Sequence, residues 1–176
     1  ALGRSPGQSV EPLVVDYDMV RPSLPESADV REKLRALFID RAVAVGMKVL
    51  TCQRAEVAQV VVNFLTEAAI TSVQISSDPI IEQELVEKMI EASIRVAGEE
   101  VELDVLYQEI ECGITMAKAA VASTGSVVVT GSDQESRLTS LVPPNHLVLL
   151  SDSHIVEDLL DLTISPEDLP SCMTLV

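Results

Sequence analysis

Helical and strand-like apolar patterns alternate along the first part of the chain, and this alternation constrains the fold more than any other feature. The spacing of apolar residues predicts helices over residues 28–45, 57–68 and 79–96. Short apolar runs between these helices predict strands at residues 47–52 and 71–76. Because the connections are short, we expect an α/β fold whose mostly parallel sheet is covered by helices.

Local signals mark where these helices begin and end. Gly46 follows the first helix as a C′ residue, and Asp78-Pro79 gives the third helix an N-cap followed by a proline at its first position. Residues 98–112 are acidic and less regular. The stretch "EEVELDVL" within them fits either a strand or the start of a helix.

The second half of the chain continues in shorter elements. We expect a slim, alanine-rich helix at residues 115–123, with Thr115 as its N-cap, and a helical face over residues 155–160 capped by Ser153. Strands are predicted at residues 126–130, 146–150 and 172–176. Two Thr-Gly-Ser triplets, at residues 124–126 and 130–132, read as turns at strand ends, with Gly125 as a helix C′ residue. The alternative is a loop of small residues whose backbone N–H groups are open to an anion.

The length of 176 residues favours a single domain. Four of the nine prolines lie in residues 1–26, which we expect to form an extended N-terminal arm, while residues 27–176 form the domain. The sequence makes no prediction of oligomeric state.

Charge and composition exclude several classes of partner. A net charge of −16 and an aromatic content of 2% leave neither the basic patch nor the stacking platform that nucleic-acid binding needs. The same charge repels an anionic membrane surface, and no apolar run approaches the ~18–20 residues of a spanning helix. Since no apolar leader opens the sequence, the cytoplasm is the expected location.

The three cysteines, Cys52, Cys112 and Cys172, are widely separated and form no C-x-x-C pair. A disulfide framework, a zinc site or an iron–sulfur cluster built by this chain alone is therefore not expected. No acid–base dyad or nucleophile–base pair stands out either, so the residues alone predict no reaction.

Two polar residues near the second half of the domain are candidates for a binding site. Arg137 follows the strand at residues 126–130, so it can face the crevice at the carboxyl ends of the strands, or it forms a surface ion pair. His146 opens an apolar strand, where a histidine satisfied by the backbone is the alternative to a ligand.

The string "GITMAKAAVASTGSVVV", followed by "RLTSLVPPNHLVLL" and "IVEDL", resembles the core signature of the lactate-utilisation (LUD) domain family. That family shows G-I-T, then A-x-A-A-I-A-E-T-G-T before an apolar strand, then R-x-x-S-x-x-P-x-x-H. The resemblance covers about residues 110–160 and has Ser123 where the family has glutamate. It implies a candidate ligand shell of Gly113, Thr115, Ser123, Thr124, Gly125, Ser126, Arg137, Ser140 and His146.

The resemblance also implies a fold and a function. The implied fold is a Rossmann-like three-layer sandwich, similar to the sugar-phosphate isomerase and coenzyme A transferase superfamily. The implied role is that of the C subunit of the three-protein system that oxidises L-lactate to pyruvate, a subunit that carries no cluster and works with iron–sulfur partner subunits. Binding of a small anionic ligand is expected. The alternatives are a coenzyme A, nucleotide or sugar-phosphate protein of the same superfamily, and a purely structural assembly protein.

Replacing Arg137 with alanine tests the candidate shell. If its guanidinium makes a charge-assisted hydrogen bond to the anion, Arg137→Ala weakens binding of L-lactate by ~1.5–3 kcal/mol in a calorimetric titration. An unchanged affinity would assign Arg137 to the surface instead.

Overall fold

The computed structural model describes residues 27–76, 83–97, 101–131, 138–162 and 172–176. Its helices are α2 (Ala28–Ala44), α3 (Val57–Glu67), α4 (Gln83–Glu91), α5 (Leu103–Glu109) and α6 (Leu138–Leu141), with the 3-10 helices η1 (Arg54–Glu56), η2 (Asp152–His154) and η3 (Leu159–Asp161). Its strands are β1 (Ser72–Ile75), β2 (Arg95–Ala97), β3 (Cys112–Met116), β4 (Ala119–Val121), β5 (Ser126–Gly131), β6 (Asn145–Leu149), β7 (Ile155–Val156) and β8 (Cys172–Leu175).

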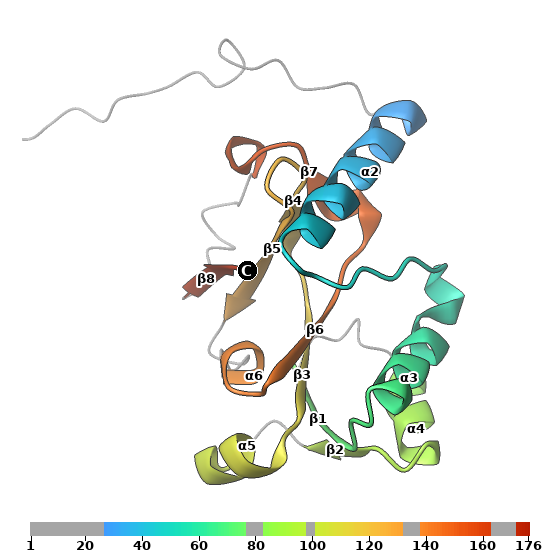
Figure 1. The fold of residues 1–176 in the computed structure, drawn as a ribbon, viewed down its shortest axis with the longest axis vertical. Helices are drawn as coiled ribbons and strands as arrows, with labels where there is room; N and C mark the ends of the chain where they lie inside the picture. Colours follow the sequence, from blue (N-terminus) through green and yellow to red (C-terminus); the bar gives the residue numbers. More distant parts are fainter. Residues whose placement is uncertain (1–26, 77–82, 98–100, 132–137, 163–171) are drawn as a thin grey trace, which may run out of the picture.

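The first sheet, sheet A, contains four parallel strands in the order β2-β1-β3-β6. Helices α3 and α4 lie on one side of it, and α5 and α6 lie on the other (Figure 1). This three-layer arrangement confirms the α/β fold with a mostly parallel sheet. The alternation of helix and strand signals predicted it because parallel strands need a crossover between them.

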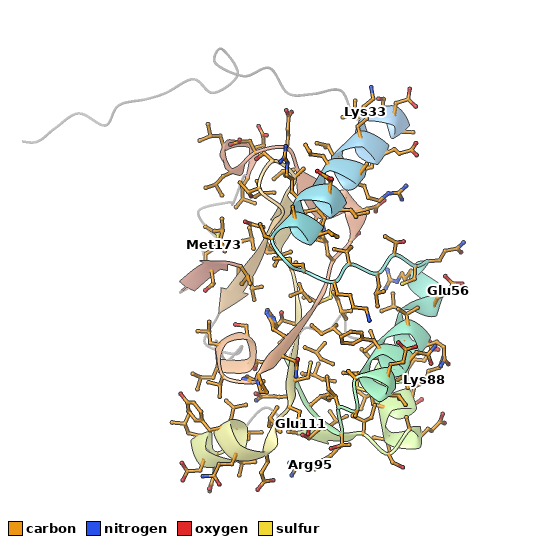
Figure 2. The ribbon with its side chains drawn as sticks, viewed as in Figure 1. Lys33, Glu56, Lys88, Arg95, Glu111 and Met173 are labelled. Atoms are coloured by element: carbon orange, nitrogen blue, oxygen red, sulfur yellow. The ribbon has the colours of Figure 1, made fainter. Side chains whose placement is uncertain are left out.

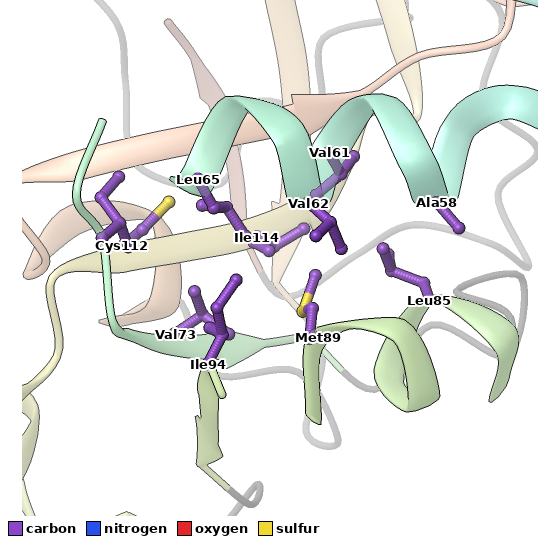
Figure 3. Close-up of a cluster of buried hydrophobic side chains, with 11 residues drawn as sticks. Ala58, Val61, Val62, Leu65, Val73, Leu85, Met89, Ile94, Cys112 and Ile114 are labelled. Atoms are coloured by element: carbon purple, nitrogen blue, oxygen red, sulfur yellow. The ribbon is translucent and has the colours of Figure 1, made fainter. Parts of the chain in front are cut away.

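The face of sheet A toward α3 and α4 forms an apolar core (Figure 3). Val73 and Ile114 extend from neighbouring strands toward Leu65 of α3 and Met89 of α4, and all four side chains are fully buried. At ~1.5–3 kcal/mol for each large apolar side chain removed from water, this core supplies much of the driving force for folding. It uses aliphatic residues because the chain has few aromatic ones.

The second sheet, sheet B, has the strand order β7-β4-β5-β8, and β5 runs antiparallel to both its neighbours. The chain passes from β3 directly into β4, so the two sheets share one continuous run of backbone. Helix α2 packs on sheet B through Phe38 and Ala42, which join a buried group containing Ala120 and Ala122.

The prediction of a helix at residues 115–123 is wrong. This alanine-rich stretch forms the end of β3 and all of β4. Thr115 is therefore a strand residue and caps no helix. Alanine favours helices intrinsically, but here Ala120 and Ala122 are fully buried beneath α2, where small side chains let the helix lie close to the sheet. Tertiary packing outweighs a propensity difference of well under ~1 kcal/mol per residue.

Two further expectations in the first half are wrong. Residues 47–52 form no strand, although Met47 and Val49 pack against the group under α2 and so explain the apolar pattern. The third helix ends at Glu91 and not near residue 96, because Ser93 adopts φ 63° and the amide of Ile94 donates to the Met89 carbonyl. Such a left-handed stop is usually marked by glycine, and without one the sequence hides it.

The helical face expected over residues 155–160 is also wrong. Ile155 and Val156 form strand β7, with η2 before it and η3 after it. One Nη atom of Arg31, in α2, donates to the carbonyl oxygens of Asp152, Ser153 and Ile155 at 3.1–3.2 Å. These long-range bonds hold the segment in extended form, and a local pattern cannot reveal them.

The remaining element predictions divide as follows. The helices at residues 28–45 and 57–68 and the strands at 71–76, 126–130, 146–150 and 172–176 are confirmed. The ambiguous stretch after residue 98 contains helix α5. The Asp78-Pro79 cap lies outside the described residues. No helix in the described part of the chain is long and apolar enough to span a membrane.

Gly125 lies in the β4–β5 turn with φ 74°, and a Cβ there would come within 2.4 Å of the Ala42 amide nitrogen in α2. Gly46 also has a positive φ, 96°, but nothing lies within 4 Å of its Cβ position. We therefore expect Gly125→Ala to lower the free energy of unfolding by about 2–5 kcal/mol and Gly46→Ala by about 1–2 kcal/mol in urea titrations. Equal losses would contradict the close packing of the turn on α2.

Candidate ligand site on the polar face of sheet A

The second face of sheet A carries several polar residues. In register, Gln74 of β1 lies beside Gly113 of β3, which lies beside His146 of β6, so their side-chain positions share one face. Ser72 and Thr115 lie two positions away on the same face. Parallel strands covered on both sides are normally apolar on both sides. A buried polar face in such a sheet is therefore unusual and calls for a functional explanation.

The buried polar side chains of the described residues belong to this region. They are Ser72, Gln74 and Thr115 in the sheet and Thr139 in α6, each exposed by 5% or less. We call the set of Gln74, Gly113, Thr115 and His146 the polar row.

At the amino end of sheet A several polar groups are hydrogen-bonded to one another. Glu111, labelled in Figure 2, accepts hydrogen bonds through Oε2 from the amide of Thr71 at 2.6 Å, from its hydroxyl at 3.1 Å and from the amide of Ser72 at 3.3 Å. The Thr71 amide bond is the main reason that the pKa of Glu111 is lowered. The Ser72 hydroxyl donates to the Glu109 carbonyl and accepts from the Glu111 amide. These contacts join the strand ends to α5 and have a structural role.

Thr115 and His146 form a hydrogen-bonded pair within the polar row. Their Oγ1 and Nε2 atoms are 2.8 Å apart, and the histidine tautomer decides which one donates. Burial lowers the pKa of His146, so its ring is neutral at neutral pH. His146 starts near the amino end of β6, as the sequence predicts, but its ring leans toward the carboxyl end to reach Thr115. A neutral imidazole can accept or donate a hydrogen bond without carrying charge into the site.

Gly113 lets α6 approach the sheet inside the polar row. A Cβ at this position would lie 1.7 Å from the backbone oxygen of Thr139, so no other residue fits without moving α6. The Thr139 carbonyl thus lies over β3, between Gln74 on one side and His146 on the other. Gly113 contributes to the site through this close approach of backbone.

Gln74 is the residue of the polar row that lacks a partner. Its side chain is 3% exposed, and its Oε1 atom is buried without a hydrogen bond in the structure as described. An unpaired buried polar atom costs about 1–3 kcal/mol, so such atoms are rare and each calls for an explanation. The sequence analysis missed Gln74. The signal was the alternation in "TSVQIS", which puts Ser72, Gln74 and Ser76 on one face of a strand expected to be covered on both sides.

The nine residues of the implied ligand shell do not form one group. Gly113, Thr115 and His146 meet in the polar row, and Ser140 lies in α6 beside Thr139, partly exposed and already engaged in an interaction. Arg137 lies outside the described residues. The other members, Ser123, Thr124, Gly125 and Ser126, form the turn from β4 into β5 in sheet B, beside α2.

The β4–β5 turn has local roles. The Ser123 hydroxyl donates to Asp158 Oδ2 over a long 3.4 Å, and Asp158 in turn caps η3. Thr124 is exposed, and Gly125 packs on α2. Gly125 is thus a hairpin residue, not the helix C′ residue that we expected.

Within the described ranges, no group of three His, Cys, Asp or Glu side chains is arranged to hold a metal ion. Cys112 lies in the apolar core, where burial raises the pKa of its thiol to about 11 and so disfavours the thiolate that metals bind. A shallow depression of about 300 Å³ lies on α2 along Asp29, Glu32, Lys33 and Ala36. A single helix lines it, and it contains none of the polar row.

Comparison with known proteins gives two matches. A model of the LUD domain matches residues 35–173. The crystal structure of a DUF162 family protein from Deinococcus radiodurans superimposes with a TM-score of 0.64, at 21% identity, over 78% of each chain. This likeness shows a shared fold. A search of curated proteins found no match.

The pKa of His146 tests its burial in the polar row. A His154→Gln variant leaves His146 as the single histidine, and an NMR titration should then give a pKa below the ordinary 6.5. Since the unfolded chain then binds more protons than the folded one, the contribution of His146 to stability is complete above pH ~6.5 and is lost as pH falls through the folded pKa. A pKa at or above 6.5 would contradict this burial.

Proposed function

The chain belongs to the LUD domain family, and from that premise we propose that it is a lactate-utilisation protein that binds a small 2-hydroxy or 2-oxo acid on the polar row. In this proposal it is the non-redox subunit for oxidation of L-lactate to pyruvate. Iron–sulfur partner subunits accept the electrons.

The observation that carries the proposal is the polar row itself, in which Gln74 Oε1 lacks a hydrogen-bond partner although the other face of the sheet is well packed. Gln74, Thr115 and His146 offer a carboxamide, a hydroxyl and a neutral imidazole on one face, where the first two side chains are buried and His146 is partly buried. These groups can donate hydrogen bonds to the carboxylate of a small acid, and they can donate to or accept from its 2-oxygen substituent. The positive charge that would complete an anion site is the role expected of Arg137, which directly precedes α6 in the chain.

The cysteines support a role without a cluster of its own. Cys112 is an apolar core thiol, and Cys52 is exposed with no cysteine near it in the sequence. Cys172 is also far from both in the sequence, whereas a cluster needs several thiolates converging on iron. The redox centre of the reaction therefore belongs to a partner in this proposal.

A matched pair of threonine variants tests where the acid binds. Thr115→Val removes the hydroxyl of the polar row at nearly constant shape, and we expect it to weaken L-lactate or pyruvate binding by about 5–30-fold in a calorimetric titration, equivalent to about 1–2 kcal/mol. Thr124→Val, in the exposed β4–β5 turn, should leave the affinity unchanged.

The opposite pattern would assign the site to the β4–β5 turn. The wild-type protein should also be more thermally stable in excess L-lactate or pyruvate, by roughly 2.7 kcal/mol at 100 times the dissociation constant. Stabilisation by coenzyme A, a nucleotide or a sugar phosphate, with none by either acid, would contradict the proposal and favour the alternative within the superfamily.

A further inference from the structure

The unpaired atom of Gln74 is an acceptor, and no donor among the described residues bonds to it. Its in-register neighbours are Ala97, with a methyl side chain, and Gly113, with none. The nearest hydroxyl toward the amino end, that of Ser72, already donates to the Glu109 carbonyl. Nothing in the described part of the protein therefore satisfies Oε1.

A second acceptor lies beside it. The Thr139 carbonyl lies against Gly113, the direct neighbour of Gln74 in the sheet. In a continuing helix this oxygen would accept from the amide four residues later, but that residue is Pro143, which has no N–H. The row thus presents two neighbouring acceptor oxygens, one from Thr139 at the Gly113 side-chain position and one from Gln74 beside it.

A pair of acceptors recognises a hydrogen-bond donor. A 2-hydroxy acid carries a hydroxyl that can donate, whereas a 2-oxo acid has only acceptors around the same carbon, and its carbonyl oxygen would be repelled. Sites built to hydrogen-bond a hydroxyl discriminate strongly against an analogue without it, because the buried acceptor is then left unpaired.

We propose that Gln74 is the specificity-determining residue of the polar row, and that it selects the 2-hydroxy acid over the 2-oxo acid by accepting a hydrogen bond from the 2-hydroxyl. This inference rests on the proposed function. It makes the protein a binder of the reduced member of the L-lactate and pyruvate pair.

Binding of L-lactate, pyruvate and propionate to the wild-type protein and to Gln74→Leu tests the proposal. We expect the wild-type protein to bind L-lactate at least tenfold more tightly than pyruvate or propionate, and Gln74→Leu to bind the three acids with affinities within about twofold of one another. Equal affinities in the wild-type protein would overturn the role of Gln74 while leaving the proposed function intact. If neither L-lactate nor pyruvate binds, the proposed function fails and the inference fails with it.

Thermal stability without ligand gives an independent readout. Since Oε1 makes no hydrogen bond to the described residues, Gln74→Leu should raise the Tm by about 2–8 °C. Ser72→Ala is the matched control on the same face, and it should lower the Tm because it breaks two formed hydrogen bonds. A lower Tm for Gln74→Leu would mean that Gln74 is a satisfied structural residue, which would overturn the proposal.

Discussion

Sheet A has two chemically different faces, and the rest of the structure depends on how each is covered. The apolar face packs on α3 and α4 and provides the buried area that stabilises the domain. The polar face is covered by α6, and Gly113 is what allows the Thr139 backbone to reach it. Alternation of side chains along β1 and β3 produces both faces from the same residues, so stability and recognition are built into the same strands.

The polar face itself divides into a completed half and an incomplete half. Around Glu111 and Ser72 the donors and acceptors are matched, and this network joins the strand ends to α5. Further along, Thr115 and His146 share one hydrogen bond, while Gln74 Oε1 has none to the described residues. In natural proteins, departures from the usual pairing of buried polar groups are expected mainly at functional or strained sites. The cost of the unpaired oxygen is small beside the apolar core, so the fold tolerates it.

Much of the fold could be predicted from the sequence, because helix and strand periods differ and the connections are short. The spacing of apolar residues along the sequence was enough to predict the parallel sheet and the helices at 28–45 and 57–68. Strand β4 could not be predicted in this way, because its alanines have the pattern of a helix. It is the packing of this segment beneath α2 that makes it a strand. The family motif identified Thr115 and His146 as site residues, but it also placed the residues of the β4–β5 turn in the same site. Closeness in the sequence does not show that the chain crosses into a second sheet between them. Gln74 was missed because no motif contains it; only the pairing of strands gives it its neighbours.

The account depends most on one claim, that a small hydroxy acid binds at the polar row. NMR titration of the isotope-labelled protein with L-lactate tests it directly, by following the side-chain amide of Gln74, the ring of His146 and the backbone of the β4–β5 turn. The account predicts saturable shifts at Gln74 and His146 together with unchanged signals at Thr124 and Gly125. Shifts confined to the β4–β5 turn, or no shifts at saturating L-lactate, would contradict it.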